Sequence, residues 1–149
     1  MTVKPRVFLD TNVLLSGIVF AGNERELLEA AIDGKLELVL SSDVIDEANE
    51  VLKKKFPKQV VLFPLFLRMV KHEEISKREY KESEKRCAGL IGDKADVPIL
   101  AAAIVSKVDY LVTGDKGLLA LKKVGETEII RTWKLLRKLR SFMCRTAKT

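Results

Sequence analysis

The feature that most constrains the fold is a series of short apolar segments separated by stretches with helical character. Segments 7–9, 36–40, 110–113 and 128–130 are rich in Val, Ile and Leu. Runs this short are typical of strands buried on both faces, and helices between such strands favour parallel pairing. The sequence therefore predicts a three-layer α/β/α fold, with helices on both faces of a central parallel sheet of four to five strands.

Helical stretches connect these strands. Residues 12–20 fit either the start of a helix or a buried loop, and residues 92–96 (GDKAD) indicate a turn. Asn23 and Ser42 are suited to cap the helices that begin with them. The expected helices cover residues 23–32, 43–55, 58–70, 76–91, 97–107, 118–121 and 132–142.

The chain has 149 residues, a length that corresponds to one domain. We expect a single domain over residues 1–140 and a basic tail over residues 141–149. The longest apolar run, 60–67, contains Pro64 and is far shorter than the ~20 residues that span a bilayer. No signal-peptide pattern is visible, and the two cysteines are too few and too far apart for a zinc ribbon or a disulfide scaffold. These observations favour a cytoplasmic protein.

Carboxylates and hydroxyls follow the predicted strands. Asp10 ends the first strand, Asp115 follows the strand at 110–113, and Asp96 begins the helix that leads into that strand. In open parallel α/β sheets, ligands bind at the carboxyl ends of the strands. Oxygen ligands gathered at one edge suit Mg²⁺ or Mn²⁺.

A fourth acid comes from the helix predicted at 43–55. At about 100° per residue, Glu47 lies about 60° from Val44, at the edge of the apolar stripe of this helix. Asp46 points to the opposite side, and Glu50 lies farther from the stripe than Glu47. Glu47 is therefore the acid of this helix that is expected nearest the strand ends.

Each of these acids has an ordinary explanation when taken alone. Asp10 and Asp96 fit helix caps, Asp115 fits a turn residue, and Glu47 fits a surface acid. Together, however, four carboxylates at one edge repel one another unless a cation neutralises them. Their joint occurrence favours a metal site.

The motifs that carry these acids resemble those of a known family. VFLDTNVLLS, LVLSSDVIDEANEVL, ADVPILAAA and DYLVTGDKGLLAL occur in this order within residues 5–135. In order and spacing the chain resembles PIN-domain ribonucleases, of the kind found as VapC-like toxins in toxin–antitoxin pairs. The resemblance implies a PIN-like fold and a metal-dependent nuclease whose catalytic and metal-binding acids are Asp10, Glu47, Asp96 and Asp115. Thr11, Asn12 and Thr113 match the polar residues that support these acids.

The resemblance also implies the reaction. One or two Mg²⁺ or Mn²⁺ ions activate a water that attacks a phosphodiester of single-stranded or structured RNA, which leaves a 5′-phosphate and a 3′-hydroxyl. One departure concerns the acidic cluster before PILA, which is often DPDD in related sequences and here is DKAD. Asp93 is a candidate auxiliary acid. Because the third residue of this cluster is Ala95 and not an acid, how tightly a second metal binds stays open.

Two further segments indicate partners. Residues 131–149 carry seven basic residues and no acid, whereas the other 130 residues hold 20 basic and 21 acidic residues. This distribution favours contact with an RNA backbone. The segment 60–70 is apolar all round, which fits a core helix or a homodimer face. The VapC resemblance implies a homodimer and a cognate antitoxin. The candidate RNA-binding residues are Arg131, Lys134, Arg137, Lys138 and Arg140.

Other enzyme classes with an acid after the first strand fit less well. A haloacid-dehalogenase-like phosphatase needs a second Asp where this chain has Asn12. A receiver domain needs a phosphoacceptor Asp that LVLSS lacks, and a dinucleotide-binding fold needs GxGxxG where this chain has DTNVLL. The alternative that stays open is a catalytically silent PIN-like module that binds RNA or protein.

Overall fold

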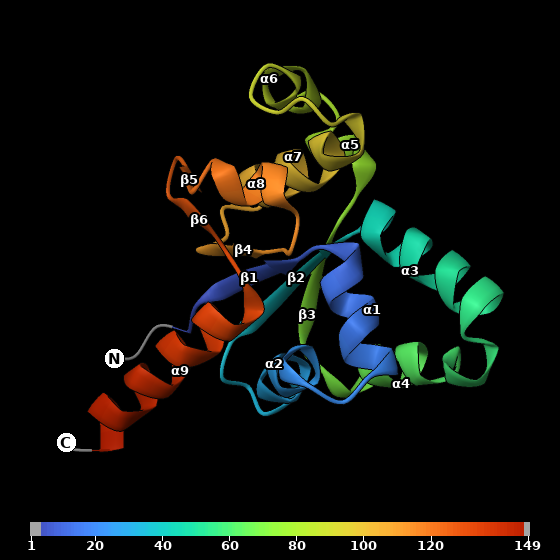
Figure 1. Ribbon diagram of the computed structural model, residues 1–149, viewed down its shortest axis with the longest axis vertical. Coiled ribbons are helices and arrows are strands. Elements are labelled where there is room, and N and C mark those ends of the chain that lie inside the picture. The colour runs from blue at the N-terminus through green and yellow to red at the C-terminus, as the bar shows by residue number, and fades with distance from the viewer. Residues whose placement is uncertain (1–3, 148–149) are drawn as a thin grey trace.

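A six-stranded sheet forms the centre of the computed structural model, which describes residues 4–147 and the side chains of residues 4–141 (Figure 1). The strand order is β3-β2-β1-β4-β6-β5. All neighbouring pairs are parallel except β5–β6. The strands are β1 (Arg6–Leu9), β2 (Glu37–Ser41), β3 (His72–Ile75), β4 (Tyr110–Val112), β5 (Lys123–Val124) and β6 (Thr127–Ile130).

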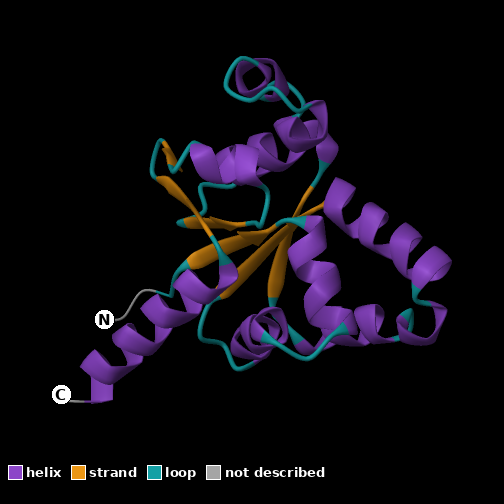
Figure 2. Cartoon of the chain, in the orientation of Figure 1, coloured by secondary structure: helices purple, strands orange, loops and turns teal. Residues whose placement is uncertain are grey.

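Helices cover both faces of this sheet, which confirms the predicted three-layer α/β/α architecture (Figure 2). Helices α1, α2 and α9 lie on one face, with α3 packed beside α1, and α5 to α8 lie on the other. No described helix is long and apolar enough to cross a membrane. The helices are α1 (Thr11–Val19), α2 (Asn23–Ile32), α3 (Ser42–Lys55), α4 (Leu62–Met69), α5 (Lys77–Tyr80), α6 (Glu84–Ala88), α7 (Val97–Val105), α8 (Lys116–Ala120) and α9 (Thr132–Ala147), with 3₁₀ turns η1 (Pro57–Gln59) and η2 (Lys94–Asp96).

The core lies where the sequence is most apolar. Phe8 in β1, Val39 in β2 and Leu111 in β4 are fully buried between the two helical layers. Each such side chain contributes about 1.5–3 kcal/mol through burial. The central strands are therefore held from both faces, and their carboxyl ends are fixed relative to one another.

The sheet is wider than expected because two of its strands carry little apolar signal. β3 (HEEI) lies at the edge of the sheet, and only its last residue, Ile75, is buried. The predicted helix over 76–91 is divided into α5 and α6, which bury Tyr80 and Cys87 respectively. The predicted helix over 58–70 consists of η1 and the shorter α4.

Both predicted helix caps are one residue off. Ser41, rather than Ser42, caps α3, because its hydroxyl accepts a hydrogen bond from the Val44 amide at 3.1 Å. α2 has Gly22 at its N-cap position instead of Asn23. α9 extends to Ala147, beyond the predicted end at residue 142. Because side chains after residue 141 lie outside the described part, the basic tail stays a prediction.

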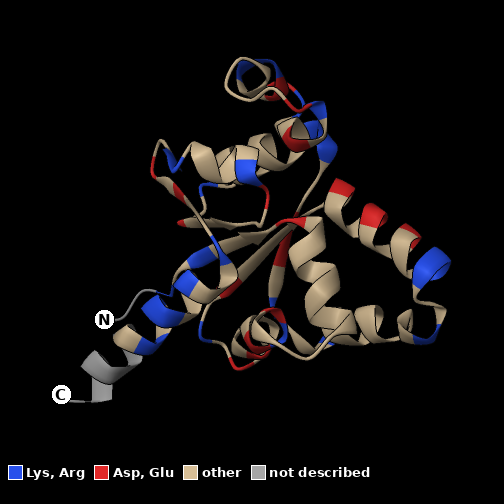
Figure 3. Cartoon of the chain, in the orientation of Figure 1, with Lys and Arg blue, Asp and Glu red and all other residues tan. Residues whose placement is uncertain are grey.

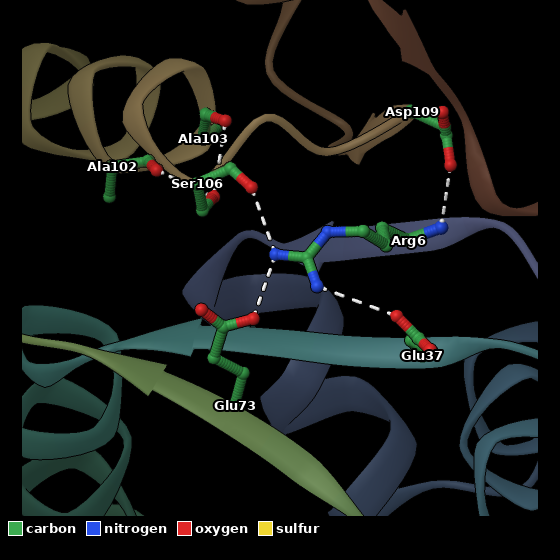
Figure 4. Close-up of polar contacts among 7 residues, drawn as sticks. All are labelled: Arg6, Glu37, Glu73, Ala102, Ala103, Ser106 and Asp109. Atoms are coloured by element: carbon green, nitrogen blue, oxygen red, sulfur yellow. Dashed lines mark hydrogen bonds and ion pairs between the residues drawn. The ribbon is translucent and has the colours of Figure 1, made fainter.

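Arg6 secures the sheet at its amino-terminal edge (Figure 4). Its guanidinium donates to Glu73 of β3 at 2.7 Å, to Glu37 of β2 at 3.4 Å and to the Ser106 carbonyl after α7 at 2.9 Å. Its backbone amide donates to the Asp109 carboxylate at 2.8 Å. One side chain thus ties the polar edge strand to the buried centre, at the end of the sheet opposite the predicted site.

Candidate metal centre

The strand order creates a crevice at the carboxyl ends of β1 and β4. From β1 the chain passes through α1 and α2 to β2 on one side of it, and it returns through α7 to β4 on the other side. Ligands of open α/β sheets bind where the strand order reverses in this way. Asp10 follows β1 and Thr113 follows β4, so both predicted residues lie at this crevice.

Asp10 and Thr113 are linked directly. The Thr113 hydroxyl donates to Asp10 Oδ2 at 2.7 Å and accepts from the Asp115 amide at 3.0 Å. Thr113 is 1% exposed, so its hydroxyl is a buried connector between the two acidic loops. The supporting role expected for Thr113 therefore has a geometric basis.

Glu47 reaches the same edge from α3. Thr11, the first residue of α1, donates its hydroxyl to Glu47 Oε2 at 3.1 Å. Thr11 adjoins Asp10, so this contact places Glu47 on the Asp10 side of the crevice. Acidic segments accordingly lie at the end of β1, after β4 and along α3 (Figure 3). Asn12 is exposed and takes no part in these contacts.

Asp93, Asp96 and Asp115 form the most compact part of the site. Each offers a carboxylate oxygen, and the three oxygens lie within 4.8 Å of one another. Asp93 Oδ1 accepts from the Ala95 amide at 3.0 Å, and Asp115 Oδ2 accepts from the Leu118 amide at 2.9 Å. These two acids therefore also serve as local caps, whereas the sequence indicates a turn residue for Asp115 and an auxiliary acid for Asp93.

Asp96 has no such structural role. Although it occupies the N-cap position of α7, its side chain makes no capping hydrogen bond. The residue is 9% exposed, and Oδ2 is buried without a hydrogen-bond partner among the described residues. A buried carboxylate oxygen without a donor is costly, so the cap interpretation fails for Asp96.

The surroundings of Asp96 oppose its ionisation. Burial, the adjoining Asp115 carboxylate and the charges of Asp93 and Asp10 together raise the pKa of Asp96 from 3.8 to about 7. Two species can occupy the space beside Oδ2: a proton shared with Asp115, or a cation. A cation reduces the repulsion among all four carboxylates, those of Asp96, Asp115, Asp93 and Asp10. A proton removes the charge of only one of them.

A cavity of about 460 Å³ gives access to these carboxylates. Gly117 of α8 lines it beside the acids, and a Cβ at Gly117 would lie 3.1 Å from Asp115 Oδ2 and 3.9 Å from Asp96 Oδ2. A larger residue at this position would crowd the carboxylate oxygens. The sequence contains no separate signal that distinguishes Gly117 from an ordinary turn glycine.

Comparison with known proteins identifies the family. The family model described as "PIN domain" matches residues 6–117. The chain belongs to the PIN-domain family. No curated protein sequence matches it.

Several solved structures share this fold at low sequence identity. VapBC2 from Rickettsia felis bound to a DNA fragment from their promoter gives a TM-score of 0.60 at 22% identity, over 85% of this chain and 98% of that chain. A toxin–antitoxin complex from Klebsiella pneumoniae gives 0.64 at 17% identity, over 85% and 97%. FitAcB from Neisseria gonorrhoeae gives 0.55 at 18% identity, over 85% and 98%.

The residues of this PIN domain fit a divalent cation. The donor set consists of carboxylates, which Mg²⁺ and Mn²⁺ prefer. Asp96 Oδ2 is the orphaned atom, and Gly117 leaves the approach to it open. Asp93, Asp96 and Asp115 are placed to hold the ion, with Asp10 close enough to act on the charge of Asp96.

Replacing Asp96 by Asn tests this assignment through stability. In EDTA, we expect Asp96→Asn to raise the free energy of unfolding by about 1–3 kcal/mol at pH 8, because the variant no longer buries a repelled charge. The folded protein binds the Asp96 proton near pH 7 and the unfolded chain binds it near pH 4. The wild type therefore gains stability relative to the variant as the pH falls from 8 to 5.

Urea unfolding of both proteins at pH 5 and pH 8 measures this difference. Asp46→Asn, a change at an exposed acid of α3, is the matched control and should change stability little at either pH. A lower stability of Asp96→Asn at pH 8 would contradict the assignment.

Proposed function

We propose that this PIN domain is a Mg²⁺- or Mn²⁺-dependent endoribonuclease that hydrolyses phosphodiester bonds of single-stranded or structured RNA. The observation that carries the proposal is the unpartnered Asp96 Oδ2 within an acidic cluster at the crevice of a PIN fold. A binding module without chemistry gains nothing from a buried, repelled carboxylate. In an active site, by contrast, a buried carboxylate with a perturbed pKa can take part in the reaction, and its cost in stability is tolerated.

Each acid has a defined part in the proposed reaction. Asp96, Asp115 and Asp10 hold one or two ions directly or through water, with Asp93 as an auxiliary acid. The chemistry that such an ion supplies when bound is a lowered pKa for its water and neutralised charge on the phosphoryl oxygens. Glu47 completes the site or orients the attacking water.

The threonines position the acids. Thr113 holds one oxygen of Asp10 and Thr11 holds one oxygen of Glu47, so the remaining oxygens are presented in fixed directions. The single histidine takes no part, because the His72 ring contacts the Val70 carbonyl at 3.0 Å and Glu74 at 3.1 Å on the edge strand β3. In-line attack then leaves a 5′-phosphate and a 3′-hydroxyl.

We further propose that the chain is a VapC-like toxin with a cognate antitoxin. Support comes from the fold that it shares with VapBC2, FitAcB and the toxin–antitoxin complex from Klebsiella pneumoniae. A neighbouring gene for a small DNA-binding protein is the observation that separates a toxin from a PIN nuclease with another role.

The apolar segment around residues 60–70 is proposed as a homodimer face. α4 is two-sided: Phe63 and Phe66 are buried in the core, whereas Leu62, Leu65 and Met69 are 40%, 47% and 62% exposed. The core interpretation and the interface interpretation thus apply to opposite sides of one helix. An exposed apolar stripe of this kind is typical of a contact surface.

RNA cleavage with matched variants tests the nuclease proposal. We expect the wild type to cleave single-stranded RNA with Mg²⁺ or Mn²⁺ and to stop in EDTA. Asp10→Asn and Asp96→Asn should lower the rate about 100-fold or more, because each removes a charge from the metal site. Glu47→Gln should lower the rate about tenfold, whereas Glu50→Gln, one turn further along the same helix, should leave it unchanged.

Two results would contradict this proposal. Equal cleavage by the wild type and Asp96→Asn, with or without EDTA, would show that the activity does not come from this site. RNA binding without cleavage at millimolar metal would support the catalytically silent module instead.

Light scattering tests the dimer. We expect the wild type to have the mass of two chains, and Leu65→Glu to have the mass of one, because a buried unpaired charge opposes association. Lys58→Glu, an exposed position in η1, is the control and should stay dimeric. A monomeric wild type would contradict the proposed face.

A further inference from the structure

A second hollow lies on the outer side of α8, between the β5–β6 hairpin and the start of α9. It has a volume of about 570 Å³. We call it the α8–α9 groove. Its lining includes Lys122, Lys123, Arg131, Trp133 and Lys134.

The groove is strongly basic and its charges are unpaired. Within residues 4–141, no acid lies within ion-pair distance of the three lysines or of Arg131. Glu128, the one acid that lines the groove, is paired with Lys138 at 3.1 Å. The groove therefore presents four free positive charges around a single, already neutralised, carboxylate.

This arrangement divides the basic residues predicted to bind RNA. Lys138 and Arg140 form ion pairs, with Glu128 and with Glu26, so they serve the packing of α9. Arg137 is exposed outside the groove. Only Arg131 and Lys134 line it, and Lys122 and Lys123 join them from the turn after α8, a contribution that the sequence pattern did not indicate.

Trp133 supplies an aromatic surface among these charges. It is 48% exposed, and Lys134 Nζ lies 5.5 Å from the centroid of its ring. The residues that anchor α9 to the core are the buried Leu135, Leu136 and Leu139, so Trp133 is not needed for packing. An exposed indole surrounded by cations matches the way proteins bind single strands, with phosphates on basic residues and bases stacked on aromatic rings.

Lys122 has an unusual backbone conformation. Its φ is +60°, in the left-handed region that glycine adopts most readily, and Gly125 in the same hairpin has φ +59°. A lysine in this conformation is strained compared with a glycine. Residues other than glycine that are held in this region are often functional. Lys122 lines the groove, and its positive charge there is a property that glycine lacks.

We propose that the α8–α9 groove binds a single-stranded segment of RNA, with phosphates at Lys122, Lys123 and Arg131 and a base stacked on Trp133. α8 connects the two sites: Leu119 lines the groove, while Gly117 and Ala120 line the acidic cavity. A strand held in the groove is thus led across α8 to the carboxylates. That this strand is then cleaved rests on the proposed nuclease function, but its binding does not.

Trp133 is the only tryptophan, so tryptophan fluorescence, excited selectively over the two tyrosines, reports on the groove. We expect a 12-nucleotide RNA added to the wild-type protein in EDTA to quench this fluorescence, and an abasic sugar–phosphate chain of equal length to quench it much less. Trp133→Leu should weaken binding of labelled RNA about tenfold, measured by anisotropy.

Lys122→Gly separates binding from folding. Glycine relieves the left-handed backbone, so the variant should be at least as stable as the wild type while its affinity for RNA falls about three- to tenfold. The slope of log K against log salt should shrink by about 0.7 for one lost phosphate contact. Lys107→Gly is the matched control, because Lys107 is an exposed lysine with φ +55° that does not line the groove.

The outcomes distinguish the two proposals. Quenching without metal-dependent cleavage would support the groove and overturn the nuclease function. Cleavage without quenching, or equal loss of affinity in Lys122→Gly and Lys107→Gly, would overturn the groove. If the groove binds a partner protein instead, RNA will cause no quenching. That result overturns the proposal that the groove binds RNA.

Discussion

The candidate metal centre is built around one electrostatic conflict: the buried carboxylate of Asp96 lies beside other carboxylates, and among the described residues Oδ2 has no hydrogen-bond donor. A folding chain avoids such contacts unless the surrounding core is stable enough to impose them. Here the three central parallel strands, which are buried along most of their length, and the helices on both faces impose it. A proton or a cation can relieve the conflict, and a donor set made of carboxylates suits a hard divalent ion.

The topology of the sheet brings the acidic residues together, and short hydrogen bonds then hold their carboxylates in place. Parallel strands bring the ends of β1 and β4 to one edge, which collects acids from distant parts of the sequence. Thr113 and Thr11 then each hold one oxygen of an acid, so the site is preorganised before a ligand arrives. At the opposite edge, Arg6 holds the polar strand β3 in place without entering the site. The end that stabilises the sheet and the proposed catalytic end are separate.

The sequence was informative where burial dictates composition. The central strands and the layered fold follow from the short apolar runs. The gathering of Asp10, Asp96 and Asp115 near one edge follows from their places after a strand or at the start of a helix. β3 escaped prediction because an edge strand needs few apolar residues: of its two glutamates, Glu73 pairs with Arg6 and Glu74 contacts His72. Whether an acid caps a helix or lacks a hydrogen-bond partner depends on small differences in distance. A sequence pattern does not specify these distances. The exposure of Trp133 was not predicted either, because an aromatic residue at the start of a helix fits a core position as well as a surface position.

The most direct test of the central claim is proton release on metal binding. Calorimetric titration of Mn²⁺ into the protein, in buffers of different ionisation enthalpy, counts the protons displaced per ion. With the pKa of Asp96 near 7, we predict close to one proton released at pH 6 and almost none at pH 8.5, with no such pH dependence in Asp96→Asn. Metal binding that releases no proton at either pH would show that Asp96 is already ionised without the ion, and would contradict the account.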